Sequence, residues 1–273
     1  MKKITPLILL LPIISIVALS LGATEVSELF RYIFNPFLNP ESASHQIIWQ
    51  IRAPRVGAAI LIGAALGVAG CLAQSSTNNP LADPAILGTS AGASLGVLLG
   101  VLTNLVSIGS AGAVVCAAIG AMAATLLTFS LARSALQLIT IGIGVSAILS
   151  AMVGLTLSAV SRPDARSISF WSFGSLSLVS SKTLYVVAPV LVIAAVIAWK
   201  IAPTLDLLSL GDASVRHIGH NAQRIRLSAF AILAVLVAVT VSSVGFTTVD
   251  WAMQDEMMEV SVTFSFTHWQ QVV

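Results

Sequence analysis

The sequence predicts an all-α protein, a polytopic bundle of helices that crosses a lipid bilayer. Two observations predict this fold class. Of the 273 residues, 57% are hydrophobic and only 9% are charged, a composition that suits a membrane better than water. Several apolar stretches also approach the roughly 20 residues that a helix needs to cross the bilayer. We therefore expect a membrane bundle without a separate soluble domain.

The first expected span covers residues 4–22 and follows Lys2 and Lys3. A signal peptide also begins with basic residues and an apolar run, but the apolar core of a signal peptide is only about 7–15 residues long. The longer run here, followed by more spans, favours an uncleaved first helix. Basic residues gather at the cytoplasmic ends of spans, so we expect the N-terminus in the cytoplasm.

Six further apolar runs bring the expected total to about seven spans. They cover residues 56–72, 91–105, 112–131, 136–160, 184–201 and 227–244. The run at 91–105 is expected as a short or buried helix. This layout puts Lys2, Lys3, Arg133, Lys200, Arg216, Arg224 and Arg226 inside, and Arg31, Arg52, Arg55, Arg162, Arg166 and Lys182 outside. Charge asymmetry therefore gives the orientation little support.

Glycines recur every four residues on the second and third expected spans. They are Gly63 and Gly67, followed by Gly88, Gly92, Gly96 and Gly100. A face without side chains lets another helix backbone approach closely. We favour such packing over the alternative of a moving contact surface.

The sequence gives little support for binding of nucleotides, metals or nucleic acids by this chain. The sequence has no GxxxxGKS or GxxxxGKT loop, so any use of ATP must depend on a partner. Cys71 and Cys116 lack metal-like neighbours and are expected to be free buried thiols. His217 and His220 have only Asp212 nearby, which favours a surface pair over a metal site. Basic residues are scattered without interleaved aromatic residues, which argues against nucleic acid, and no cofactor is expected.

The pentapeptide GTSAG around Ser90 matches the GxSxG pattern of serine hydrolases. That pattern requires a strand-to-helix turn and a histidine base. Ser90 instead lies at the start of a glycine-rich apolar helix, and the four histidines lie in expected loops or in the tail. A membrane serine hydrolase is therefore the minor alternative.

Two polar segments flank the second expected span. The segment WQIRAPR places Arg52 and Arg55 three residues apart, so helical spacing puts both guanidinium groups on one side. They could pair with carboxylates of a partner, and a lipid headgroup anchor is an equal alternative. The segment STNNPLADP, with Asn79 and Leu81, predicts a turn on the cytoplasmic side.

A third polar segment, LLSLGDASVRHIGHNAQRIR, occupies residues 207–226. Asp212 is expected to cap a short helix that Gly219 ends, with Arg216 and His217 exposed. A short rigid helix across the cytoplasmic face is suited to docking into another protein. A solvated loop is the alternative.

These segments resemble the FecCD family of ABC importer permeases, which move iron-siderophore complexes, haem and cobalamin. The resemblance rests on IRAPRVGAAILIGAALGVAGCLAQSSTNNPLADPAILGTSAGASLG, FWSFGSLS and LDLLSLGDASVRHIGHNAQRIRL, in this order between about residues 48 and 246. It implies a non-enzymatic permease of the bacterial inner membrane that imports iron(III)-siderophore complexes, with haem or cobalamin as alternatives. The implied partners are an ATP-binding cassette ATPase, a periplasmic substrate-binding protein and a second permease subunit.

The resemblance also implies roles on the outer face. Arg52 and Arg55 match arginines that receive glutamates of the binding protein. Trp171 and Gly174 match a helix beside the outer mouth of the pathway.

On the cytoplasmic face, Asn79 and Leu81 match positions at the gate. The residues that match the loop docked in a cleft of the ATPase are Gly211, Asp212, Arg216 and Gly219. The implied mechanism is alternating access, driven by ATPase subunits that close on ATP.

The resemblance ends at about residue 246. The family continues with a GLxxPHxxR segment and roughly three more helices, to about ten, whereas residues 247–273 contain four acidic residues and no long apolar run. We expect an incomplete permease domain over 1–246 and a non-family tail over 247–273, from a truncation or a shifted frame. A non-functional remnant is the alternative from another class.

Overall fold

The computed structural model describes residues 5–21, 29–35, 42–107, 110–132, 134–159, 176, 179 and 181–244. All regular structure in these residues is helical, which confirms the predicted fold class. The helices are α1 (Thr5–Ser20), α2 (Leu29–Phe34), α3 (Ala43–Gln46), η1 (Ile47–Arg52), α4 (Ala53–Thr77), η2 (Pro84–Leu87), α5 (Thr89–Leu102), α6 (Ala111–Leu131), α7 (Ala135–Ala159), α9 (Ser181–Asp206), η4 (Leu207–Leu210), α10 (Asp212–His217) and α11 (Ala222–Val244).

Five helical stretches in the described residues are long and apolar enough to cross a membrane. They are Ala43–Thr77, Ala111–Leu131, Leu136–Ser158, Ser181–Leu210 and Ala222–Ser243. The other two expected spans correspond to α1 and α5, which are shorter apolar helices. Large apolar side chains are exposed on the outer faces of the bundle, including Ile119, Ile148 and Ile193. Such faces suit contact with lipid.

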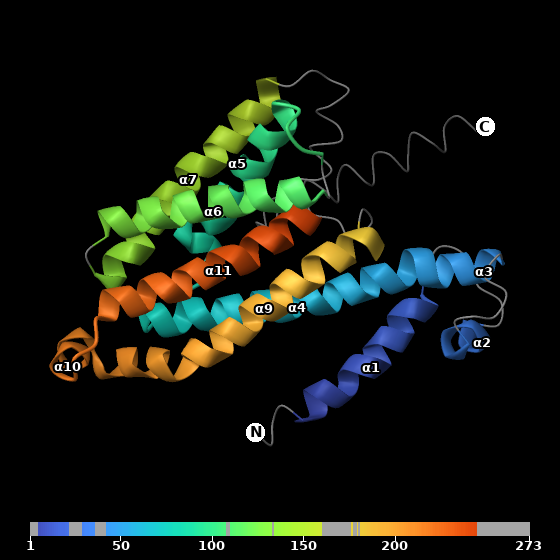
Figure 1. Ribbon diagram of the computed structural model, residues 1–273, viewed down its shortest axis with the longest axis horizontal. Helices are drawn as coiled ribbons and strands as arrows, with labels where there is room; N and C mark the ends of the chain where they lie inside the picture. Colours follow the sequence, from blue (N-terminus) through green and yellow to red (C-terminus); the bar gives the residue numbers. More distant parts are fainter. Residues whose placement is uncertain are drawn as a thin grey trace, which may run out of the picture.

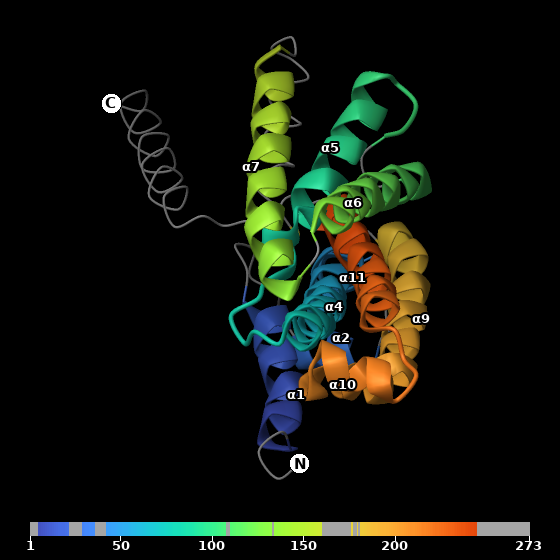
Figure 2. The same ribbon diagram turned by 90° about the vertical axis from the view of Figure 1, so that its left-hand side faces the viewer.

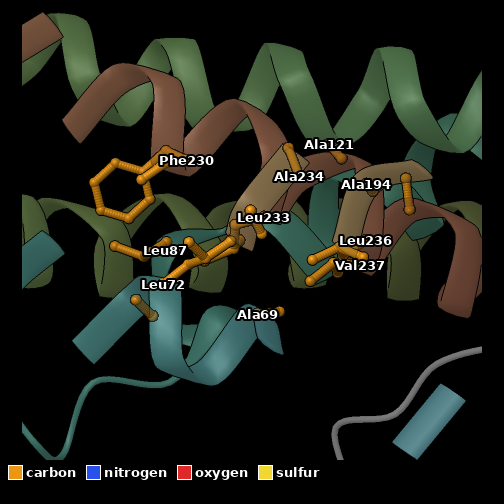
Figure 3. Close-up of a cluster of buried hydrophobic side chains, with 14 of the residues drawn as sticks. Ala69, Leu72, Leu87, Ala121, Ala194, Phe230, Leu233, Ala234, Leu236 and Val237 are labelled. Carbon is orange, nitrogen blue, oxygen red and sulfur yellow. The ribbon is translucent and has the colours of Figure 1, made fainter. Parts of the chain in front are cut away.

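α11 is the central helix of the bundle. Its apolar span is 72% buried, whereas the other four spans are 33% buried or less. It contacts α4, α5, α6 and α9, and the two views show these helices around it (Figure 1 and Figure 2). Figure 3 shows the core that results, built from Ala69, Leu72, Leu87, Ala121, Ala194, Phe230, Leu233, Ala234, Leu236 and Val237. The apolar residues on all sides of α11 beyond Arg226 suit this central place.

Glycines bring α5 and α6 into backbone contact. A Cβ atom on Gly92 would lie 2.5 Å from the carbonyl oxygen of Gly120, and one on Gly96 would overlap the carbonyl oxygen of Cys116. The predicted close packing is confirmed here. A Cβ on Gly63 or Gly67 would meet no atom within 4 Å, so the glycine face of α4 is open in the described structure.

The thiol of Cys71 shares this open face of α4. Cys71 is exposed and Cys116 is only partly buried, although both are free. The expectation of buried thiols is therefore wrong for Cys71. Gly67 and Ser75, one turn before and after it, are exposed as well, because this side of α4 is turned away from the core.

The second span begins earlier than predicted, since α3, η1 and α4 form one helical stretch from Ala43 to Thr77. The π-helical turn η1 ends at Arg52, two residues before Pro54, and the N–H of Ala53 bonds the carbonyl of Ile48 five residues earlier. Proline has no N–H for the carbonyl four residues before it, and its ring clashes with that carbonyl. A wider turn accommodates the ring without ending the helix.

Candidate functional site

The predicted functional residues that the structure describes lie at two ends of the bundle. Arg52 and Arg55 lie at the start of α4, and Asn79 and Leu81 follow its end. The helix between them rises by about 1.5 Å per residue, or about 36 Å from Arg52 to Ser76. The hydrocarbon core of a bilayer is about 30 Å thick. The two groups are thus separated by about the thickness of the hydrocarbon core. Figure 1 shows α4 running across the bundle from α3 towards α10.

Arg52 joins α4 to the C-terminal end of α1. Its side chain donates to the carbonyl oxygens of Leu19 at 2.7 Å and Ser20 at 3.2 Å. The last carbonyls of a helix have no partner within it and carry partial negative charge, so an arginine there is favourable. Arg52 is consequently 8% exposed, and Arg55 is partly buried. Docking of a binding protein by this pair stays a prediction.

The turn of residues 78–83 follows α4 as predicted, and we name it the 78–83 turn. It begins at Asn78, which adopts the left-handed conformation with φ 51°. The side chain of Asn79 accepts a hydrogen bond from the N–H of Leu81 at 2.9 Å, and Asp83 accepts one from the N–H of Ala85 at 2.7 Å. These side chains satisfy the backbone of the turn. The side chain of Leu81 is 83% exposed.

Residues 207–220, named here the 207–220 segment, comprise η4, α10 and the turn before α11. Leu208 and Val215 are fully buried and fasten the segment to the core. Arg216 and His217 are exposed, as predicted. The turns on either side of α10 use positive φ angles, 86° at Gly211 and 83° at Gly219, which glycine adopts readily.

The predicted capping role of Asp212 is wrong. Gly211 holds the N-cap position without a side-chain bond, and Asp212 is the first residue of α10. Its carboxylate oxygens instead accept hydrogen bonds from both terminal nitrogens of Arg226, at 2.7 and 2.9 Å. The Nε of Arg226 donates to the carbonyl oxygen of Ser76 at 2.9 Å. Arg226 is 6% exposed.

The hydrogen bonds from Arg226 hold the pKa of Asp212 below its ordinary value, against the opposing effect of partial burial. A carboxyl group whose pKa is lowered by folding stabilises the fold above its ordinary pKa, and this contribution is lost as the pH falls through the lowered value. The ion pair is therefore retained throughout the neutral range.

Beside this pair a polar cavity of about 280 Å³ opens between the start of α11 and the ends of α6 and α7. It is lined by polar groups from the 207–220 segment and α11 and by apolar groups from α6 and α7, including Arg216, His220, Gln223, Phe129 and Leu138. The 207–220 segment thus has a polar cavity beside its exposed helix, α10.

Sequence reasoning missed Arg226 and Asn78. It placed Arg226 only among the cytoplasmic basic residues, although an arginine directly before an apolar span is costly to bury and signals a partner. Asn78 donates to the carbonyl oxygen of Leu208 at 2.9 Å, across 130 residues. No local pattern indicates that contact.

Ser90 is 4% exposed on the buried side of α5. It does not occupy the exposed strand-to-helix turn that a hydrolase nucleophile needs, so the hydrolase alternative lacks the required geometry. Trp171, Gly174 and the tail of residues 247–273 lie outside the described residues.

The chain is similar to known membrane permeases. The sequence profile of the FecCD transport family matches residues 7–248. The chain is 33% identical to the hemin transport system permease protein HmuU of Yersinia pestis, over 88% of this chain and 72% of the relative. It is 33% identical to the ferric enterobactin transport system permease protein FepD of Escherichia coli, over the same two shares. It is 31% identical to the vitamin B12 import system permease protein BtuC of Klebsiella pneumoniae, over 65% of this chain and 55% of the relative.

A solved structure is also similar. It is presented as an inward-facing conformation of a metal-chelate type ABC transporter, and it matches with a TM-score of 0.76 at 27% identity. The match covers 89% of this chain and 76% of that chain.

Proposed function

The chain belongs to the FecCD transport family, and from this membership we propose that it is the permease subunit of an ATP-driven importer of iron(III)-siderophore complexes in a bacterial inner membrane. The 207–220 segment carries the proposal. Its buried side chains, Leu208 and Val215, hold a short helix whose Arg216 and His217 are exposed. A surface that is already rigid loses little conformational entropy when a partner binds.

The partner at this end is a separate ATPase subunit. The sequence contains no GxxxxGKS or GxxxxGKT loop, so the energy of ATP must reach the chain through a protein contact. In this proposal α10 docks into the ATPase, with Gly211 and Gly219 shaping the turns beside it and Asp212 and Arg216 on the docked helix. Closure of the ATPase on ATP then displaces the 207–220 segment and shifts the bundle between two states.

At the opposite end we assign Arg52 and Arg55 to the surface that receives a periplasmic substrate-binding protein. Guanidinium groups bind carboxylates by paired hydrogen bonds. Arg52 holds the end of α1 against the start of α4, and Arg55 lies one turn further along α4. A rigid pair of helices gives the binding protein a defined orientation.

The pathway is proposed to lie between this chain and a second permease subunit. α5, α6 and α7 contain no charged residue, so a polar cargo meets few groups that would hold it tightly. Weak binding along the pathway favours release into the cytoplasm. Asn79 and Leu81 are proposed to lie at its cytoplasmic mouth, where the exposed Leu81 can close against the second subunit.

An uptake assay tests the proposed function and its substrate. The chain is reconstituted in liposomes with its ATPase, binding protein and second subunit, and supplied with ferric siderophores, haem or cobalamin. We expect ATP-dependent uptake of a ferric siderophore. Uptake of haem or cobalamin alone would show that the substrate is not a ferric siderophore. The absence of ATP-dependent uptake of all three would refute the transport function of this chain.

In the same assay, Arg216→Glu reverses a charge on the proposed docking helix. Uptake and ATPase binding should fall by about tenfold, the effect of about 1.4 kcal/mol of lost binding. The matched control is Arg224→Glu. It also reverses an exposed charge, but the residue lies in α11 and not in the proposed docking helix α10. If both variants retained full ATPase binding, α10 would not be the docking element.

A further inference from the structure

Arg226 connects two parts of the chain that are far apart in sequence. Its terminal nitrogens bond the carboxylate of Asp212 in α10, and its Nε bonds the carbonyl oxygen of Ser76. Ser76 lies in the last turn of α4, where carbonyls have no partner within the helix. One buried side chain therefore joins the 207–220 segment to the C-terminal end of α4.

Asn78 provides a second connection between the same parts. Its side-chain amide donates to the carbonyl oxygen of Leu208, the fully buried residue of η4. α4 is thus bonded to the 207–220 segment on both sides of Gly211, through Leu208 before it and through Asp212 after it. Two separate bonds resist rotation of the segment as well as its translation.

On its far side, the 78–83 turn leads into η2, which is held by other helices. The hydroxyl of Thr128 in α6 donates to the carbonyl oxygen of Leu87 at 3.2 Å, and the hydroxyl of Ser146 in α7 donates to that of Ala85 at 3.3 Å. The 78–83 turn therefore links the C-terminal end of α4, which is bonded to the 207–220 segment, to η2, which is bonded to α6 and α7.

We propose that Arg226 is a positioning residue that makes the 207–220 segment and the C-terminal end of α4 move as one body, so that displacement of the segment is absorbed in the 78–83 turn. The inference rests on the proposed function only for the cause of the displacement. Residues 79–83 are the part of the turn between the two anchored ends. Leu81, whose side chain is 83% exposed, is then the residue that changes position.

Hydrogen exchange of the full chain in lipid nanodiscs tests this connection without any partner. Arg226→Met removes all three hydrogen bonds while keeping an unbranched side chain. The amides of Val215, bonded to Gly211, and of Asn79, bonded to Gln74, should then exchange about ten- to hundredfold faster, the scale expected for lost charged hydrogen bonds. Arg224→Met is the matched control and should leave both amides protected.

A second variant separates the two halves of the connection. Asp212→Asn breaks the ion pair but leaves the bond from Arg226 to Ser76, so exchange should rise at Val215 and stay slow at Asn79. If Arg226→Met gave this same pattern, Arg226 would not join α10 to α4. Unchanged exchange at both amides in Arg226→Met would also overturn the proposal.

The complete transporter provides a functional readout. In Arg226→Met the ratio of substrate imported to ATP hydrolysed should fall by at least about fivefold, the lower end of coupling between sites. A merely structural arginine would lower uptake and hydrolysis together and leave this ratio constant, which would contradict the positioning role. A wild-type complex that imports nothing would refute the proposed function instead, and the exchange experiment would still decide whether Arg226 joins the two parts.

Discussion

A buried arginine is stable only where acceptors match its donors. Arg226 meets this condition with the carboxylate of Asp212 and the carbonyl oxygen of Ser76. Loss of one partner of a buried pair costs about 3–5 kcal/mol when both charges are desolvated. The side chain of Asp212 is 48% exposed, so water replaces part of the interaction, and we expect the cost for this pair to lie below that range.

Gly96 offers a prediction about packing at a single residue. Gly96→Ala would place a Cβ against the carbonyl oxygen of Cys116, and backbone atoms on two packed helices cannot move apart locally. We expect a loss of about 1–3 kcal/mol, typical of overpacking, measured as a lower thermal unfolding temperature in detergent.

The control for this prediction is Gly63→Ala, because a Cβ there meets no atom within 4 Å. Alanine is favoured over glycine in a helix by about 1 kcal/mol, so this variant should be neutral or more stable. Equal losses in the two variants would contradict the account of α5 and α6.

The residue predictions succeeded where local chemistry decides the outcome. Exposure of Arg216 and His217 follows from the polar face of a short helix, and the turn at Asn79 follows from its neighbouring prolines. Asp212 has the local pattern of a cap, but a carboxylate bonds a guanidinium group more strongly than a backbone N–H. Its partner Arg226 lies 14 residues away, beyond the reach of capping rules.

At the scale of elements, α4 is the helix that connects the two faces of the bundle. Its length was underestimated because the apolar run ends before the helix does. Polar residues interrupt the apolar run at both ends, in the segments AQSST and WQIRAP. The backbone hydrogen bonds of these segments nevertheless continue the helical pattern through Thr77 and, with the π-helical turn, through Pro54. Hydropathy measures the apolar part of a span, not the helix ends at the interface.

Variants of Asn78 test the conformation at the C-terminal end of α4. Asn78→Gly retains the left-handed conformation and loses only the bond to Leu208, which costs about 0.5–1.5 kcal/mol. Asn78→Ala loses that bond as well and leaves an alanine in the left-handed region, which costs about 1–2 kcal/mol more than glycine there. The thermal unfolding temperature should therefore be highest for the wild type, lower for Asn78→Gly and lowest for Asn78→Ala. Equal stability of the two variants would show that the conformation at residue 78 is not the one described here.

At the scale of the whole molecule, the apolar runs predicted which segments are helical but not how they are arranged. In a membrane, the lipid-facing side and the buried side of a helix are both apolar, so hydrophobic periodicity does not distinguish them. This is why the central position of α11 and the exposed side of Cys71 could not be predicted. The short length of α5 was predicted, since its apolar run is short for a bilayer.

The arrangement places the groups assigned to two partners about one membrane thickness apart, with the 207–220 segment and the 78–83 turn at one end and Arg52 and Arg55 at the other. The hydrogen bonds from Arg226 and Asn78 fix the first group to α4, and those from Arg52 fix the other end to α1. The central claim is that these ends face the cytoplasm and the periplasm, respectively.

Cysteine accessibility in spheroplasts tests this claim most directly. Single cysteines replace Ser209 or Gln50, both exposed residues, in a chain in which Cys71 and Cys116 are changed to serine. A membrane-impermeant maleimide should label Gln50→Cys in intact spheroplasts, and should label Ser209→Cys only after the membrane is permeabilised. Labelling of both positions from the same side would contradict the account.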